Sequence, residues 1–510
     1  MSRLPSLLPT QRYGYDPADT VYLMSGQPRT LDPALTHSGP SGPVGHIFSG
    51  LVQLDTSLQV VPDLAAGWQI SPDGTRYTFY LHPNARFHDG RPVTAADIIA
   101  SWERATDPAL GSDTALTYLG DITGVPEKVS GTAVTIRGLR ALDAHTLEVE
   151  IDAPKNYFLA KLAYPVAFVV DTESVTSRDW EQQPNGSGPF VLDTWQDDQR
   201  LVLARFDGYY GEPPTIGHVV YLLDAGLPLT RYENGDIDLV GIGGATLERL
   251  RDPNNPLSTH LRTGVDMCTS YVGFNATLPP FDDVRVRQAF SHALDSVRLI
   301  AGLMAGQAFP ANGPLPPGMP GYQDRPAPYP YDPELARALL AEAGYTPATL
   351  PPLTYTTAGY GDISPYVVAI ITMWEESLGI AIEPQVLDPY IYNDALYGGN
   401  LGHLFDLGWC ADYPDPENFL DVLYHSRSAQ NLGRFSDPAL DVALEEARTI
   451  ADPAARLAAY AAIEDDIVAA APAVFISHSL SAVLVNPALK NYELTPIGVP
   501  QWHRVWLERE

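Results

Sequence analysis

The twelve residues from Gly408 to Phe419 bring together several side chains that can do chemistry. They include a tryptophan, a cysteine, a tyrosine and three carboxylates: Trp409, Cys410, Tyr413, Asp412, Asp415 and Glu417. The stretch follows Leu404–Leu407, which we predict to be a strand, and two prolines turn the chain sharply away from it. Loops that follow regular elements carry a disproportionate share of binding and catalytic residues. The stretch is therefore either a functional site or a surface loop anchored by a buried tryptophan.

A carboxylate pair, such as Asp412 and Asp415, could serve as the acid and base of a glycoside hydrolase. Other catalytic patterns do not occur: there is no His-Glu-x-x-His, Gly-x-Ser-x-Gly, Gly-Lys phosphate loop or Cys-x-x-Cys. Gly241–Gly244 misses the dinucleotide fingerprint because Thr246 stands at its last glycine. The 12 histidines show no metal-ligand spacing. We therefore expect no metal, no cofactor and no enzyme, with the glycoside hydrolase as the rival class.

The length and the net charge of the chain limit its possible domain number and binding partners. The chain has 510 residues, 45% of them apolar, enough for about three domains with packed cores. Its net charge of −31 argues against binding to nucleic acid or to an anionic membrane face, and it mildly favours cationic ligands.

No apolar run of about 18 residues occurs, so no membrane-spanning helix is predicted. Residues 1–16 lack the apolar core of a signal peptide, which leaves a cytoplasmic protein or an exported one whose signal was removed.

The pattern of apolar residues predicts a mixture of strands and helices. Alternation predicts strands at Thr20–Met24, Tyr77–Leu81, His145–Ile151 and Ala473–Val485. Helices are predicted after capping residues, several of them followed by proline: Thr94, Asp283, Asp332, Ser364, Asp437 and Asp452. The chain becomes helix-rich from Met267 onward. The sequence therefore predicts an α/β protein with a change of architecture near that residue.

The two cysteines, Cys268 and Cys410, lie far apart in the sequence. Their spacing alone leaves two possibilities open, a pair of buried thiols or a disulfide.

Eight short phrases occur in one characteristic order along nearly the whole chain: Leu31–Pro33, Phe48–Val52, Val61–Trp68, Phe87–Asp97, Gly188–Phe190, Asn234–Asp238, Val284–Ala289 and Tyr331–Gly344. In this order they resemble the peptide/nickel-type solute-binding proteins of ABC importers. Gly408–Tyr413 is similar to the ligand-binding strand end of the oligopeptide-binding members.

The resemblance implies the α/β fold of the type II periplasmic binding proteins in its large, cluster C form. Two lobes would be joined by a hinge, with a third domain packed on the first lobe. Lobe I would comprise residues 1–49, 184–266 and 477–510, the extra domain 50–183, and lobe II 267–476. The ligand would bind in a cleft that closes by hinge motion.

The resemblance also implies which residues bind the ligand. The family's aspartate at the place of Asp412 accepts the α-ammonium of a bound peptide, and a charge-assisted hydrogen bond of this kind contributes roughly 1.5–3 kcal/mol. Trp409 and Tyr413 would line the cleft, while His37 and Gly39 occupy the matching contact positions on the other lobe. Turn capping by Asp412 and core packing by the two aromatic rings remain open alternatives.

Three departures from the family pattern bear on the ligand. His37 stands where the enteric oligopeptide binder has a carboxylate, so one partner of the ammonium is missing. Ile363 and Asp406 stand where peptide binders place His or Arg near the ligand's carboxylate. A peptide of fixed length with a salt-bridged C-terminus is therefore not expected. A longer peptide, or an oligosaccharide stacked on aromatic rings, remains open.

The remaining expectations also come from the resemblance. It pairs Cys268 with Cys410 in a disulfide, which suits an exported protein. It implies a monomeric periplasmic or cell-surface protein whose export signal or lipoprotein anchor is absent from the sequence given. The solute would be an oligopeptide or a molecule of similar size, and the protein partner would be the permease of an ABC transporter. No nucleic acid partner is expected.

Overall fold

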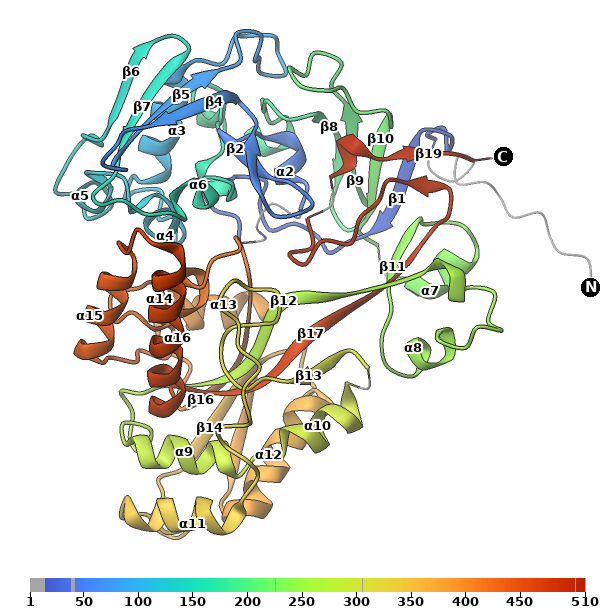
Figure 1. Ribbon diagram of the computed structural model, residues 1–510. Coiled ribbons are helices and arrows are strands. Elements are labelled where there is room, and N and C mark those ends of the chain that lie inside the picture. Colours follow the sequence, from blue (N-terminus) through green and yellow to red (C-terminus); the bar gives the residue numbers. More distant parts are fainter. Residues whose placement is uncertain (1–13, 38–41, 225, 305, 500, 510) are drawn as a thin grey trace, which may run out of the picture. The chain divides into compact units, whose positions relative to one another are not determined.

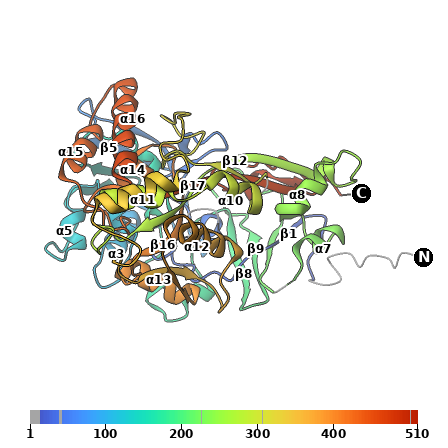
Figure 2. The same cartoon turned by 90° about the horizontal axis from the view of Figure 1, so that it is seen from below.

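The computed structural model describes residues 14–37, 42–224, 226–304, 306–499 and 501–509. Contacts within the chain divide it into two compact units, whose elements are drawn in Figures 1 and 2. Unit 1 comprises Met1–Ile242, Leu250–Thr263 and Ala482–Glu510, and unit 2 comprises Gly243–Arg249 and Gly264–Ser481. The bounds of the three expected domains remain a prediction.

Unit 1 contains a mixed sheet with the strand order β11-β1-β10-β9-β8. Its strands are β1 (Thr20–Met24), β8 (Phe190–Gln196), β9 (Arg200–Arg205), β10 (His218–Leu222) and β11 (Leu239–Gly241). β1 pairs in parallel with β10 and β11, and the other pairs in this row are antiparallel. Buried residues such as Val21, Leu203 and Val219 pack against Trp502 from the C-terminal segment. The sheet thus joins residues from both ends of the chain in one core.

A smaller antiparallel sheet in unit 1 has the order β4-β5-β7-β6. Its strands are β4 (Ala65–Ile70), β5 (Arg76–Leu81), β6 (Leu139–Asp143) and β7 (Thr146–Glu150). Helix α3 (Ala95–Ala105) begins with a capping box at Thr94 and buries Trp102, which donates a hydrogen bond to the carbonyl of Ala167. The short elements of this unit are α2 (Val44–Ile47), β2 (Val52–Leu54), β3 (Val60–Pro62), α4 (Ala115–Leu119), α5 (Val125–Val129), α6 (Phe158–Lys161), α7 (Pro228–Glu233), β18 (Leu489–Lys490) and β19 (Trp506–Leu507).

Unit 2 contains a second row of strands, in the order β15-β14-β16-β12-β17. The strands are β12 (Leu261–Phe274), β13 (Ala308–Pro310), β14 (Leu353–Ala358), β15 (Ile382–Leu387), β16 (Leu404–Cys410) and β17 (Ala473–Val485). β14 pairs in parallel with β15 and β16, whereas β16 is antiparallel to β12. On one face, Tyr355 and Leu404 pack with Phe290 and Trp374 in the core of the unit.

The helices of unit 2 are α8 (Gly244–Leu250), which extends one residue past the unit's bound, α9 (Val284–His292), α10 (Ser296–Leu303), α11 (Pro333–Glu342), α12 (Pro365–Leu378), α13 (Pro389–Gly398), α14 (Glu417–Tyr424), α15 (Pro438–Ala447) and α16 (Pro453–Ala470). Asp332, Ser364, Asp437 and Asp452 each precede a first-turn proline, and their side chains accept hydrogen bonds from backbone N–H groups of the first turn. These caps satisfy donors that a helix start otherwise leaves unpaired. The predicted helix starts are confirmed.

The prediction that the strand ends at Leu407 is wrong. β16 continues to Cys410, because its residues pair with β12 from Leu404 opposite Phe274 to Cys410 opposite Cys268. The N–H of Ala411 extends this ladder with a 2.8 Å hydrogen bond to the carbonyl of Met267. Trp409 therefore lies within the strand rather than in the loop.

The last register pair of this ladder is also covalent. Cys268 and Cys410 form a disulfide, which confirms the predicted bridge. It closes a loop with a sequence separation of 142 residues. Among the residues that the structure describes, no helix is both long and apolar enough to cross a membrane.

Replacing both cysteines by serine is expected to lower the free energy of unfolding by roughly 4–5 kcal/mol in the chain-entropy model, because the unfolded chain regains the freedom of a long loop. Urea denaturation of the oxidised protein, the reduced protein and the Cys268→Ser/Cys410→Ser variant measures this. The reduced protein and the double variant should coincide, and an unchanged midpoint in both would contradict the prediction.

Candidate functional site

Asp412 lies two residues beyond the end of β16, where Asn418 from α14 holds it. The Asn418 side-chain oxygen accepts hydrogen bonds from the backbone N–H of Asp412 at 3.0 Å and from the indole N–H of Trp409 at 3.2 Å. Its amide nitrogen faces Oδ2 of Asp412 at 3.4 Å. Asn418 is fully buried, so its geometry is set by packing. Because its amide is neutral, it orients the Asp412 carboxylate without neutralising its charge.

The turn after Asp412 is fixed to α16 by an ion pair. Arg456 contacts both carboxylate oxygens of Asp415, at 2.7 and 2.8 Å, and the Arg456 side chain is only 5% exposed. Asp415 also accepts a hydrogen bond from the N–H of Glu417 and so caps the start of α14. Two-point pairing of this kind gives geometric specificity as well as energy. The proline-containing turn is therefore held rigidly.

The two aromatic residues of the stretch differ in exposure. Trp409 is partly exposed, and its N–H is used by Asn418. Tyr413 is fully buried, and its hydroxyl donates a hydrogen bond to the buried carboxylate of Glu417. Burial and the Glu417 charge raise the pKa of Tyr413 well above its usual value, so the hydroxyl stays protonated and remains a donor. Trp409 is thus partly accessible to solvent, whereas Tyr413 supports the turn from within.

The two positions that depart from the peptide-binding pattern also lie in unit 2. Ile363 is partly buried and packs on the core beside α12. Asp406 lies within β16, opposite Val272 of β12. Its carboxylate is partly buried.

The predicted contacts from the N-terminal segment lie in unit 1. His37 is exposed, with its Nε2 atom 3.6 Å from a carboxylate oxygen of Asp113. Gly39 lies outside the described residues. The preceding segment is anchored by Asp32, which is nearly fully buried and receives a two-point contact from Arg104 of α3. The segment that ends at His37 is therefore well supported on its own unit.

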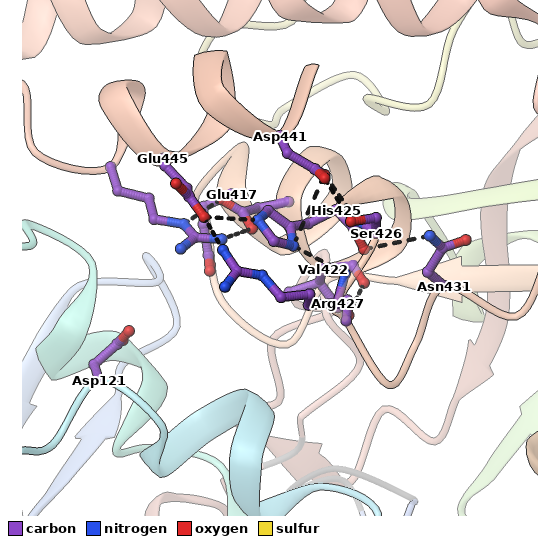
Figure 3. Close-up of polar contacts among 12 residues, drawn as sticks. Asp121, Glu417, Val422, His425, Ser426, Arg427, Asn431, Asp441 and Glu445 are labelled. Atoms are coloured by element: carbon purple, nitrogen blue, oxygen red, sulfur yellow. Dashed lines mark hydrogen bonds and ion pairs between the residues drawn. The ribbon is translucent and has the colours of Figure 1, made fainter. Parts of the chain in front are cut away.

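A second polar cluster, around His425, contains the residue types of a catalytic triad without the required geometry (Figure 3). The backbone N–H of Arg427 donates to His425 Nδ1 at 3.1 Å, which leaves the ring proton on Nε2, facing Glu445 at 3.3 Å. The hydroxyl of Ser426 donates to Asp441 instead of to the histidine. The histidine is thus not placed to activate the serine as in a catalytic triad, and the cluster ties the end of α14 to α15.

Within the described ranges, no group of three or more His, Cys, Asp or Glu side chains could hold a metal ion. The arrangement around Asp412 can present an oriented carboxylate near a partly exposed tryptophan. The residues that sequence reasoning missed are Asn418 and Arg456. Asn418 is the second residue of the helix that follows the two prolines, which is a usable signal, whereas Arg456 has no local signal because it comes from another helix.

Replacing Asn418 by Ala is expected to cost about 1–3 kcal/mol of stability, because it removes the acceptor shared by Trp409 and the backbone of Asp412. Thermal or urea denaturation measures the loss. Asn254→Ala, on an exposed loop, is the matched control and should stay within about 0.5 kcal/mol of wild type. Equal melting of the two variants would show that the Asn418 contacts contribute nothing.

The comparisons with known proteins agree on one family. The family model for bacterial extracellular solute-binding proteins, family 5 Middle, matches residues 59–431. The periplasmic oligopeptide-binding protein OppA of Escherichia coli K12 is 30% identical over 486 residues, covering 91% of this chain and 88% of that protein. The structure of the Escherichia coli murein tripeptide-binding protein MppA matches with a TM-score of 0.86 at 29% identity, over 96% of this chain and 98% of its own.

A structure of Haemophilus influenzae OppA in complex with the peptide RPPGFSPFR matches with a TM-score of 0.86 at 22% identity, covering 97% of this chain and all of that one. These matches confirm the predicted α/β fold and its three-domain family architecture. The chain therefore belongs to family 5 of the bacterial extracellular solute-binding proteins, and it is a solute-binding protein that acts outside the cytoplasm and not an enzyme.

Proposed function

We propose that this protein captures peptides for uptake by an ABC importer, and that Asp412 accepts the α-ammonium of the bound peptide. The observation that carries the proposal is the placement of Asp412 just beyond β16, with its backbone and carboxylate both oriented by the neutral, buried Asn418. A carboxylate fixed in this way can form a charge-assisted hydrogen bond without first reorganising.

The relatives support peptides as the ligand class. Three of them are named for oligopeptide, murein peptide and dipeptide binding, and the oligopeptide binder covers nearly the whole chain. Another is named as a heme-binding protein, so the family fold by itself does not fix the ligand. The peptide proposal therefore rests on Asp412 together with the relatives.

The other site residues are proposed as lesser contacts. Trp409, which is partly exposed, would contact the ligand, as would His37 and Gly39, whereas the fully buried Tyr413 would act by supporting the turn. An oligosaccharide is the second candidate ligand, because the Trp409 ring could stack on a sugar. Delivery to an ABC permease, a monomeric state and a lipid anchor complete the proposal.

Native mass spectrometry of the purified protein, before and after denaturation, tests the ligand class. A mixture of peptide masses released on denaturation is expected. A ladder of masses spaced by one hexose would overturn the peptide proposal and favour stacking on Trp409. A protein that releases nothing and shows no thermal shift with a peptide mixture would also overturn it.

Replacing Asp412 by Asn is expected to weaken peptide binding about 10- to 100-fold, because the ammonium loses its charged partner. Calorimetric titration with a peptide identified by mass spectrometry measures the change. Acetylating the peptide's N-terminus should weaken binding to wild type by a similar factor and should have little further effect on Asp412→Asn. Glu383→Gln, which removes an exposed carboxylate of β15, is the control and should bind like wild type. Full affinity of Asp412→Asn would exclude the ammonium role.

A further inference from the structure

Asp406 is a partly buried carboxylate for which the described residues of unit 2 supply no counter-charge. Its Oδ1 atom is buried and has no hydrogen-bond partner among the described residues. Burial raises the pKa of Asp406, and a hydrogen bond from the Thr357 side chain lowers it in part. No basic side chain is among the groups that shift the pKa of Asp406. A desolvated carboxylate without a cation is costly, and most such groups in proteins are paired. The carboxylate of Asp406 therefore lacks a compensating positive charge among the described residues.

Tyrosines surround this carboxylate. Tyr392 donates its hydroxyl to the backbone carbonyl of Asp406 at 2.6 Å. The Tyr355 hydroxyl is buried and has no hydrogen-bond partner in the described part of the chain. Burial and the charge of Asp406 raise the pKa values of Tyr355, Tyr366 and Tyr392, so all three hydroxyls stay neutral. The group consists of one negative charge and several aromatic rings.

This combination matches a cation. An ammonium or guanidinium is attracted both by a carboxylate and by the faces of tyrosine rings. A free carboxylate, in contrast, would face the like charge of Asp406 and would find no positive partner there. Asp406 also lies on the same strand as Trp409 and only a short distance along the chain from Asp412.

We infer that Asp406 is a second cation-recognising position of the solute site, and that the preferred ligand is a peptide with a lysine or arginine side chain distant from its N-terminus. This rests on the proposed function, in which Asp412 holds the α-ammonium. The strand carries the chain four residues from Asp406 to Cys410, about 13 Å at the usual rise of a strand, and Asp412 lies two residues beyond its end. Because an extended peptide has a similar rise, a dipeptide is too short to satisfy both carboxylates, and the basic residue follows several positions later.

The test compares two sets of alanine-based hexapeptides with a free N-terminus and an amidated C-terminus. One set carries a single lysine at each position from the second to the sixth, and the other carries norleucine, which has a similar apolar chain without the charge. Calorimetric titration of wild type should show that lysine binds about tenfold or more tightly than norleucine at one or two positions. This comparison in wild type needs no variant to fold.

Asp406→Asn should reduce that preference to within about twofold while the norleucine peptides keep nearly their wild-type affinity. Glu383→Gln, which removes an exposed carboxylate from strand β15 of the same sheet, should retain the full preference. A purely structural role for Asp406 would change the stability of the protein, or the affinity for both peptide sets, without changing their ratio.

The hexapeptide titrations distinguish a failure of the proposed role of Asp406 from a failure of the proposed peptide capture. Hexapeptides that bind without any preference for lysine would overturn the role of Asp406 and leave peptide capture standing. A lysine preference that survives in Asp406→Asn would overturn it as well. If no hexapeptide binds at all, peptide capture fails and the role of Asp406 fails with it.

Discussion

The antiparallel pairing of β16 with β12, closed by the disulfide between Cys268 and Cys410, is the constraint on which the proposed site depends. The ladder carries β16 as far as Cys410 and so decides where the chain leaves the sheet. Because the disulfide joins the final pair, the end of this strand cannot fray without moving β12 as well. Asp412 follows two residues later, and its position is thus fixed by the end of the strand rather than by a free loop.

The turn beyond the strand orients two carboxylates, those of Asp412 and Asp415, through different partners. Arg456 neutralises Asp415 and fixes the turn, and Asn418 holds Asp412 through a neutral amide. Arg456 thus pairs with the supporting carboxylate of Asp415, and Asn418 orients the carboxylate of Asp412. A site prepared in this way loses little entropy when it binds its ligand.

Local signals explain what could be predicted from the sequence. The bounds of β1 and β17 match the expected strands, and the helix after Ser364 ends at Gly379 in the left-handed conformation, as a capping serine and a terminal glycine predict. The expected end of β16 was wrong because pairing with β12 is a tertiary contact. The role of Arg456 and the isolation of Asp406 also depend on contacts between separate elements, which no local pattern encodes. Proposing Asp412 as a ligand-binding residue required the family resemblance.

Hydrogen exchange measured by mass spectrometry, with and without a mixture of peptides, tests most directly whether the end of β16 binds the solute. Binding there predicts that amides in the segment from Gly408 to Asn418 exchange more slowly when peptides are present, with the disulfide intact in both samples. The backbone of this turn would then be shielded by ligand. Unchanged exchange throughout this segment, with protection appearing only elsewhere in the protein, would contradict the assignment of the site.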